Sequence, residues 1–263
     1  MNGIISNQIK AQFVKELIKK NERPDGRDFL EYRPISINRN VFENCEGSAV
    51  CNLGDTKVLA GVKIDLATPF PDRPREGMLS VGCEFSPIAH PTFQAGPPDE
   101  RSIELARVVD RGIRAANAID LTKLFVAEGK VLGVFIDLYI LDHNGNLTDA
   151  AALAAMSAIK YAVVPKIDQD GAVYKLNREE RHGKLPLGDD VVTSTFEKVN
   201  GSIILDASIE EETASSGRLT FGTTTSGMVC SAQKSGAAGF SLEEFDLLLD
   251  TALEKRKELL KLL

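Results

Sequence analysis

The chain has 263 residues, of which 43% are hydrophobic and 26% are charged, and its formal net charge is −7. This composition is typical of a folded protein with one large domain or two ordinary ones, and it argues against a disordered chain. The acidic balance excludes a general electrostatic attraction to nucleic acid, so contact with RNA would need a local basic patch.

Neither a membrane segment nor a metal site is expected. No apolar run approaches the roughly 20 residues of a membrane span, and no secretory signal pattern opens the chain. We therefore expect a soluble, cytoplasmic protein without a membrane partner. The cysteines lack the spacing of zinc ligands, so we expect reduced, mostly buried thiols, no metal site and no cofactor. They are Cys45, Cys51, Cys83 and Cys230.

The first half of the chain is predicted to contain three helices and five strands. Apolar residues at helical spacing predict an amphipathic helix over residues 4–20, which the turn at Pro24 ends. Strands are expected at residues 35–37, 47–53, 57–63, 78–85 and 131–141. One helix is expected to begin at Asp99 or Glu100, and an Ala-rich helix is expected over residues 149–163. Pro165 is expected to end this half.

The second half is expected to follow a polar loop that begins after Lys166. Strands are predicted at residues 190–198 and 228–233, with a hairpin over residues 201–222 between them. The capping-box spacing of Ser241 and Glu244 predicts the start of a final helix. The motifs at residues 47–50 and 201–204 each open a predicted hairpin, which favours two similar units. We expect an N-terminal helix and turn at residues 1–25, a first unit at residues 26–165 and a second at residues 190–263.

The predicted hairpin carries many acids on one arm. Four carboxylates precede its second strand, where a metal ion or a proton-transfer site could lie: Asp206, Glu210, Glu211 and Glu212. The returning strand instead opens with Arg218, and no carboxylate occurs from Thr213 to Leu242. Paired-carboxylate chemistry needs two acids that converge on one point. The hairpin therefore looks like half of an active site.

Four segments carry a resemblance to a known family. They are Arg-Pro-Asp-Gly-Arg at residues 23–27, Gly-Ser-Ala-Val-Cys-Asn-Leu-Gly-Asp-Thr-Lys-Val-Leu-Ala-Gly at 47–61, Glu-Leu-Ala-Arg-Val-Val-Asp-Arg at 104–111 and Cys-Ser-Ala-Gln-Lys-Ser-Gly at 230–236. Together they resemble the RNase PH family, and most of all the non-catalytic ring subunits of the archaeal exosome. The resemblance implies an α+β, RNase PH-type fold (ribosomal protein S5 domain 2-like). Such a fold has two β-α units with mixed sheets packed on helices.

The resemblance also implies partners. Relatives assemble into a hexameric ring of three heterodimers, in which catalytic and non-catalytic subunits alternate, and RNA-binding cap subunits join the ring. Catalytic members shorten RNA from its 3′ end by phosphorolysis, in which inorganic phosphate attacks the last phosphodiester. This reaction needs a phosphate cradle, cations for the RNA backbone and an acid for the leaving oxygen.

Each of these three parts is altered in this sequence. The Gly-Gly-Thr-Arg-like phosphate turn of catalytic relatives corresponds to residues 144–148, which contain no arginine. Their Arg-Arg-Ser helix start corresponds to residues 100–102, where Glu100 would repel phosphate. Their second acid corresponds to Arg218, six residues after Glu212. The resemblance therefore implies a non-catalytic subunit that orders a catalytic partner and helps to bind RNA.

Several arginines are candidates for RNA binding. Arg107, Arg111 and Arg114 share one face of the predicted helix and could guide RNA to a partner's active site. Alternatively, Glu104 and Asp110 could partly neutralise them on a solvated face. Arg101 could reach a phosphate or form a surface salt bridge. Arg73 and Arg75 could face the central channel of a ring or be ordinary loop residues.

Two other functions remain open. One is an active homo-oligomeric phosphorolytic 3′-to-5′ exoribonuclease with a rearranged catalytic set, such as Asp206 with Glu212. The other is a scaffold without contact to RNA.

Overall fold

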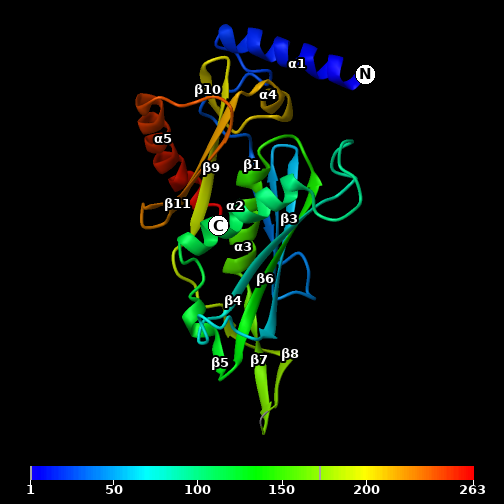
Figure 1. The fold of residues 1–263 in the computed structure, drawn as a ribbon, viewed down its shortest axis with the longest axis vertical. Helices are drawn as coiled ribbons and strands as arrows, with labels where there is room; N and C mark the ends of the chain where they lie inside the picture. Colours follow the sequence, from blue (N-terminus) through cyan, green and yellow to red (C-terminus); the bar gives the residue numbers. More distant parts are fainter. Residues whose placement is uncertain (1, 172) are drawn as a thin grey trace.

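The computed structural model describes residues 2–171 and 173–263, so Met1 of the expected N-terminal unit lies outside the described residues. Within them a first sheet has six strands in the order β1-β2-β3-β6-β4, with β5 also paired to β6 (Figure 1). The strands are β1 (Ile35–Arg39), β2 (Gly47–Leu53), β3 (Thr56–Ala67), β4 (Met78–Phe85), β5 (Phe125–Ala127) and β6 (Lys130–Asp142). Neighbours pair antiparallel except β4 and β6, which are parallel. The five expected strands are confirmed, and β5 is an addition.

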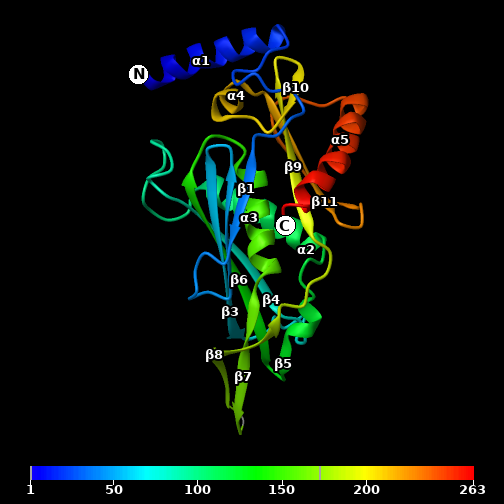
Figure 2. The same ribbon diagram turned by 180° about the vertical axis from the view of Figure 1, so that it is seen from behind.

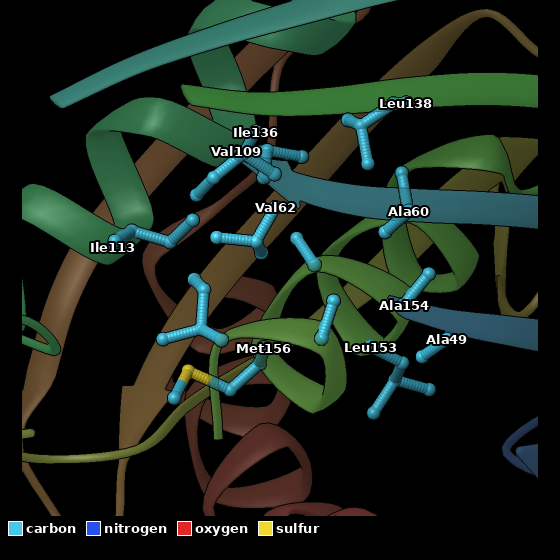
Figure 3. Close-up of a cluster of buried hydrophobic side chains, with 14 of the residues drawn as sticks. Ala49, Ala60, Val62, Val109, Ile113, Ile136, Leu138, Leu153, Ala154 and Met156 are labelled. Atoms are coloured by element: carbon cyan, nitrogen blue, oxygen red, sulfur yellow. The ribbon is translucent and has the colours of Figure 1, made fainter. Parts of the chain in front are cut away.

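Two helices pack on one face of this sheet, α2 (Glu100–Ala115) on β4 and α3 (Leu147–Lys160) on β2 and β3. Helix α3 lies in the centre of the core, where its alanines are buried, and Ala154 faces Ala49 and Ala60 of the strands (Figure 3). The backbones approach closely, since a Cβ added to Gly47 would lie only 2.3 Å from the carbonyl oxygen of Ala158. The expectation that the Ala-rich helix serves close packing is therefore confirmed. It ends three residues before the expected position because the next strand begins at Val163.

The polar loop expected after Lys166 is wrong. This segment forms a hairpin of β7 (Val163–Asp170) and β8 (Val173–Lys184), which projects from the body in both views (Figures 1 and 2). Ile167 and Leu176 pack against the main core, while charged pairs such as Lys166 with Glu180 cover the outside. The many charges concealed the strand signal, because only a few positions face the core.

A second sheet follows, with strands in the order β10-β9-β11-β12 and antiparallel pairing throughout. It consists of β9 (Val191–Val199), β10 (Ser202–Leu205), β11 (Gly217–Thr224) and β12 (Val229–Gly236). The hairpin expected over residues 201–222 is wrong, because β10 and β11 pair with opposite edges of β9 and not with each other. A short helix, α4 (Ile209–Ala214), replaces the expected acidic connection. Its capping box joins Ser208 and Glu211, a signal that the cluster of acids obscured.

Helices at the two chain ends complete the second half of the molecule. Helix α5 (Leu242–Leu260) begins at the expected capping box and packs on β9 and β11. Helix α1 (Asn2–Lys19) packs its buried Val14 and Ile18 near α4, and its N-terminal end points away from the body (Figure 2). The main core also takes in Val191, Val192 and Leu259, so both halves of the chain contribute to it.

Candidate functional site

The three altered catalytic parts meet at one cavity of about 280 Å³, between the N-terminal ends of α2 and α3, helix α4 and strand β11. Arg101 comes from the first turn of α2, Thr148 from the first turn of α3, and Glu212 and Arg218 from α4 and β11. The sequence-based prediction that these positions belong to one site is consistent with this geometry.

The turn that would cradle phosphate is occupied by the chain itself. Asn146 adopts a left-handed conformation (φ 49°) as the N-cap of α3, and its side chain accepts a hydrogen bond from the backbone N–H of Asp149. The backbone N–H of Asn146 donates to Glu212 Oε1 at 2.9 Å. The Glu212 carboxylate therefore accepts the hydrogen bond of the N–H at the start of α3, where a bound anion would otherwise accept it.

Arg218 is held between two carboxylates. Its Nη2 donates to Glu212 Oε1 at 2.8 Å, and its Nε donates to Glu197 on the neighbouring strand β9. Burial alone would lower the pKa of Arg218, but the charges of Glu212 and Glu197 outweigh it and raise the pKa. Burial raises the pKa of Glu197 despite the opposing effect of Arg218. A permanently charged guanidinium thus stands where a second acid would have to exchange protons.

The four clustered acids do not converge. Glu210 pairs with Lys10 at the surface, at 3.0 Å. Glu211 forms a bidentate pair with Arg23, with both N–O distances 2.8 Å and both side chains fully buried. Of these four acids, Glu212 is the one that lines the cavity. The sequence placed these residues together, but the helical turn of α4 sends them in different directions.

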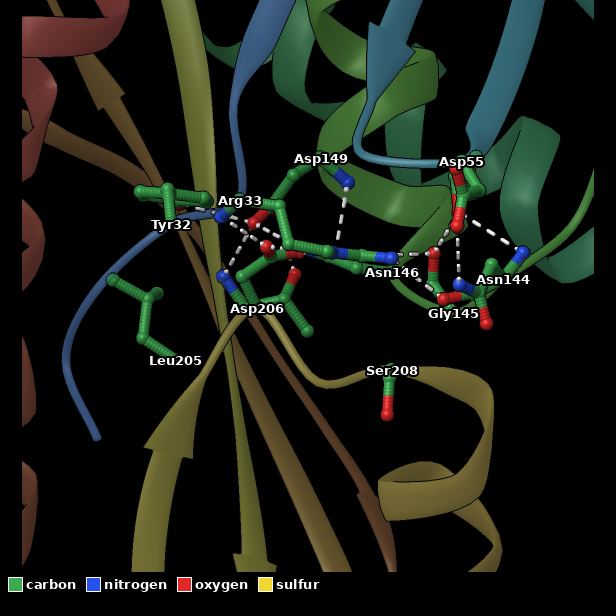
Figure 4. Close-up of polar contacts among 12 residues, drawn as sticks. Tyr32, Arg33, Asp55, Asn144, Gly145, Asn146, Asp149, Leu205, Asp206 and Ser208 are labelled. Atoms are coloured by element: carbon green, nitrogen blue, oxygen red, sulfur yellow. Dashed lines mark hydrogen bonds and ion pairs between the residues drawn. The ribbon is translucent and has the colours of Figure 1, made fainter. Parts of the chain in front are cut away.

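Asp206 is the centre of a buried structural network (Figure 4). Its carboxylate accepts from Arg27 Nη1 (3.0 Å), Arg33 N, Nε and Nη2 (2.8, 2.9 and 2.8 Å) and Asn146 Nδ2 (2.8 Å). Burial alone would raise the pKa of Asp206, but the hydrogen bonds and charge of Arg33 lower it. With its oxygens occupied and its side chain 0% exposed, Asp206 is a cross-link between segments. The expectation of a metal or proton-transfer role for Asp206, alone or with Glu212, is therefore wrong.

An aromatic wall that sequence reasoning missed lines the other side of the cavity. Phe93 stacks on His143 with ring centroids 5.4 Å apart, and the Arg101 guanidinium lies 5.2 Å from the Phe93 ring centroid. Burial, with His90 and nearby arginines, lowers the pKa of His143 to about 4, so its ring is neutral at neutral pH. The sequence offered one signal for His143: it directly precedes the Asn144–Gly145 turn, which was already expected to lie at the site. Arg101 also pairs with Asp99 at 2.8 Å, as the surface salt-bridge alternative expects.

The arginine row of α2, formed by Arg107, Arg111 and Arg114, lies on one exposed face of the helix. Arg114 pairs with Asp110 at 2.8 Å and donates to the carbonyl of Leu79 at 3.1 Å. Within the described part of the chain, Arg107 and Arg111 form no ion pair. Of the two acids that could neutralise this row, Asp110 pairs with Arg114, and Glu104 lines the cavity. Acids of the same helix therefore neutralise Arg114 but not Arg107 or Arg111.

The two loop arginines lie apart from the cavity. Arg73 pairs with Glu76 at 3.5 Å and, with Arg114, lines a separate hollow of about 400 Å³. The guanidinium of Arg75 lies 5.5 Å from the centroid of the Phe125 ring. The structure thus brings Arg73 and Arg114 to one hollow, but it does not join either to Arg101.

Metal-binding clusters and helices able to span a membrane are both absent from residues 2–171 and 173–263. These residues contain no group of three or more His, Cys, Asp or Glu side chains placed to hold a metal ion. None of the helices in that part of the chain is long and apolar enough to cross a membrane.

Comparison with known proteins gives matches over the whole chain. Two profiles of the 3′ exoribonuclease family match, domain 1 at residues 31–165 and domain 2 at residues 189–255. The chain is 44% identical over 264 residues to the protein named exosome complex component Rrp42 of Thermococcus gammatolerans, covering 100% of this chain and 95% of that protein.

Solved structures confirm the expected fold. A chain of the Archaeoglobus fulgidus exosome, described as having RNA bound to the active site, matches with a TM-score of 0.90 and 42% identity over 98% of each chain. A chain of an archaeal exosome core matches with a TM-score of 0.86 and 40% identity, covering 100% of this chain and 99% of that one. The chain therefore belongs to the RNase PH, or 3′ exoribonuclease, family.

Proposed function

We propose that this chain is a non-catalytic subunit of a phosphorolytic, 3′-to-5′ RNA-degrading exosome. The proposal is carried by the position of Arg218, which is locked between Glu212 and Glu197 where a second acid would be required. Losing a positioned proton-transfer group costs about a hundred- to ten-thousand-fold in rate. The full-length similarity to archaeal proteins named as exosome components supports the same assignment.

The partner is a catalytic RNase PH-like subunit, in a hexameric ring of three heterodimers with RNA-binding cap subunits, acting in the cytoplasm. In this arrangement the units at residues 26–165 and 190–263 form one protomer, and residues 1–25 join its surface. The ring gives the partner's active site its correct geometry, while this chain adds no second site. The relative described with RNA in the active site supports RNA as the shared substrate.

The RNA contact is the arginine row of α2. Arg107 and Arg111 are exposed and form no ion pair within the described residues, so they are free to meet phosphates. Three other arginines are secondary candidates, because each already has a partner in the chain. Arg101 pairs with Asp99, Arg73 pairs with Glu76, and Arg75 stacks on Phe125.

Salt-dependent RNA binding by the reconstituted complex tests this role. Replacing Arg107 and Arg111 by Gln should weaken RNA retention and lower the slope of log affinity against log salt by roughly one unit per lost phosphate contact. Lys257→Gln, which removes an exposed cation of α5, is the matched control and should leave the slope unchanged. An unchanged slope in the double variant would favour a scaffold without RNA contact.

The alternative of an active homo-oligomeric exoribonuclease makes a different prediction. It requires phosphate-dependent RNA shortening by the purified chain at its own oligomeric size, measured by light scattering. The occupied oxygens of Asp206 leave that alternative without its second acid.

A further inference from the structure

The cavity beside Arg218 is closed to anions but not filled. The Asn146 N–H already donates to Glu212 at 2.9 Å, and Arg218 is held between Glu212 and Glu197. Glu104 also lines the cavity and forms no ion pair within the described residues. A phosphate or carboxylate would therefore meet an uncompensated carboxylate and find its natural donors occupied.

The size and one wall of the cavity suit a small ring system. The cavity volume is about 280 Å³, whereas a cavity of about 150 Å³ already holds a benzene molecule. One side is apolar and is formed by Phe85, Leu105, Val108 and Leu147. Ligand sites typically combine such a wall with a few polar groups, which fix the orientation of the ligand.

The other wall is polar and is built by strands β11 and β12. Their register places Thr220 opposite Gln233 and Arg218 opposite Ser235, and all four side chains line the cavity. Thr148 joins them from the first turn of α3 and is only 8% exposed. Within the described residues, the side chains of Thr148, Gln233 and Ser235 form no hydrogen bond. Buried polar groups are normally paired, so this wall is suited to a hydrogen-bonding ligand.

The direction of one hydrogen bond on this wall is fixed by Asp149, which is fully buried below it. The Asp149 carboxylate accepts from two N–H donors, Asn146 Nδ2 at 2.9 Å and Thr195 N at 3.0 Å, and from Thr195 Oγ1 at 2.8 Å. Because Thr195 gives its one hydroxyl proton to Asp149, it can only accept from Thr220 Oγ1, 3.0 Å away. Thr220 therefore offers the cavity an acceptor, as Glu104 does, and a ligand there has to donate.

We propose that this cavity binds an uncharged heterocycle with an amino group, namely a nucleoside whose base carries an exocyclic amine. The amine donates to the acceptors at Thr220 and Glu104, and the ring lies against the apolar wall. Gln233 and Ser235 pair with the remaining polar atoms of the base. The inference goes beyond the proposed function, which gives this cavity no ligand, and it does not depend on a ring partner.

Calorimetric titration of the full chain with matched nucleosides tests the inference. Adenosine and cytidine carry the amine, whereas inosine and uridine carry a carbonyl oxygen at the same position. Adenosine or cytidine should bind at least about tenfold more tightly than its carbonyl counterpart, because that oxygen would face acceptors and leave them unpaired. The monophosphate of the tighter nucleoside should also bind at least about tenfold more weakly, since its charge meets a site closed to anions. No binding of any nucleoside at millimolar concentration, equal binding within both pairs, or equal binding of the monophosphate would overturn the inference.

Two variants locate the binding in this cavity. Thr220→Val keeps the shape of the side chain and removes the acceptor, while Glu104→Gln replaces an exposed carboxylate and leaves the core untouched. Each should weaken binding of the preferred nucleoside by at least about tenfold, with cooperative unfolding retained. Glu128→Gln, an exposed acid outside the cavity, is the matched control and should bind as wild type does. Wild-type affinity in both Thr220→Val and Glu104→Gln would refute this site.

Discussion

Asp206→Asn separates a structural role of this acid from a catalytic one. The substitution removes the charge that compensates Arg27 and Arg33, whose side chains are only 11% and 8% exposed. Removing one partner of a buried ion pair costs about 3–5 kcal/mol, because the remaining charge stays buried and uncompensated. For a chain of this size the melting temperature should fall by roughly 6–20 °C, at about 2–4 °C per kcal/mol.

Thermal and urea unfolding measure this loss, and the same acidic cluster supplies the control. Glu210→Gln removes a carboxylate paired with Lys10 at the surface, which should cost at most about 1 kcal/mol. The pH dependence gives a second check. The pKa of Asp206 is lowered in the folded state, so its contribution is present above its unfolded pKa and is lost as pH falls through the folded pKa. Wild type should therefore lose more stability than Asp206→Asn between neutral and acidic pH. If Asp206→Asn and Glu210→Gln were equally stable, the structural assignment of Asp206 would be incorrect.

Three further predictions concern the core, the turn and the cavity. Met156→Ala should lower the free energy of unfolding by about 2–5 kcal/mol in urea titration, because Met156 is fully buried on α3. A loss below about 1 kcal/mol would contradict its place in the core. Gly145→Ala should lower the melting temperature more than Gly129→Ala. Both glycines have positive φ, but only at Gly145 would the new Cβ lie 2.3 Å from a backbone oxygen, that of Ala207. Equal losses in the two variants would refute that contact. His143→Gln should lose less stability than wild type between about pH 6.5 and pH 4, because in this range the unfolded wild-type chain binds a proton that the folded His143 ring, with a pKa of about 4, does not. An identical loss of stability in the variant and in wild type would refute the burial of His143 as a neutral ring.

The sequence predicted most elements because local signals agreed with tertiary structure. The capping box at Ser241 and Glu244 fixed the start of α5, and the Ala-rich run predicted a closely packed helix. The polar hairpin of β7 and β8 was missed because few of its side chains meet the core. Strand order was missed for a different reason: β10 and β11 are close in sequence, yet both pair with β9, and no local pattern records such a choice.

The candidate site was predicted at the level of residues but not of contacts. Glu212 was expected to match the first acid of catalytic relatives and Arg218 to replace the second. The structure adds that these two side chains bind each other and that Glu212 accepts the hydrogen bond of the Asn146 backbone N–H. The role of Asp206 could not be predicted, because its partners Arg27 and Arg33 lie more than 170 positions away in the chain. Long-range ion pairs of this kind leave no spacing signal.

The absence of a second active site is tested most directly in a complex whose catalytic partner has been inactivated by replacing its own catalytic acid. RNA, inorganic phosphate and the reconstituted complex are combined, and released nucleoside diphosphates are measured. The account predicts no release above a control without phosphate, while the complex with the active partner degrades the same RNA. Phosphate-dependent release from the inactivated complex, lost on Glu212→Gln in this chain, would contradict it.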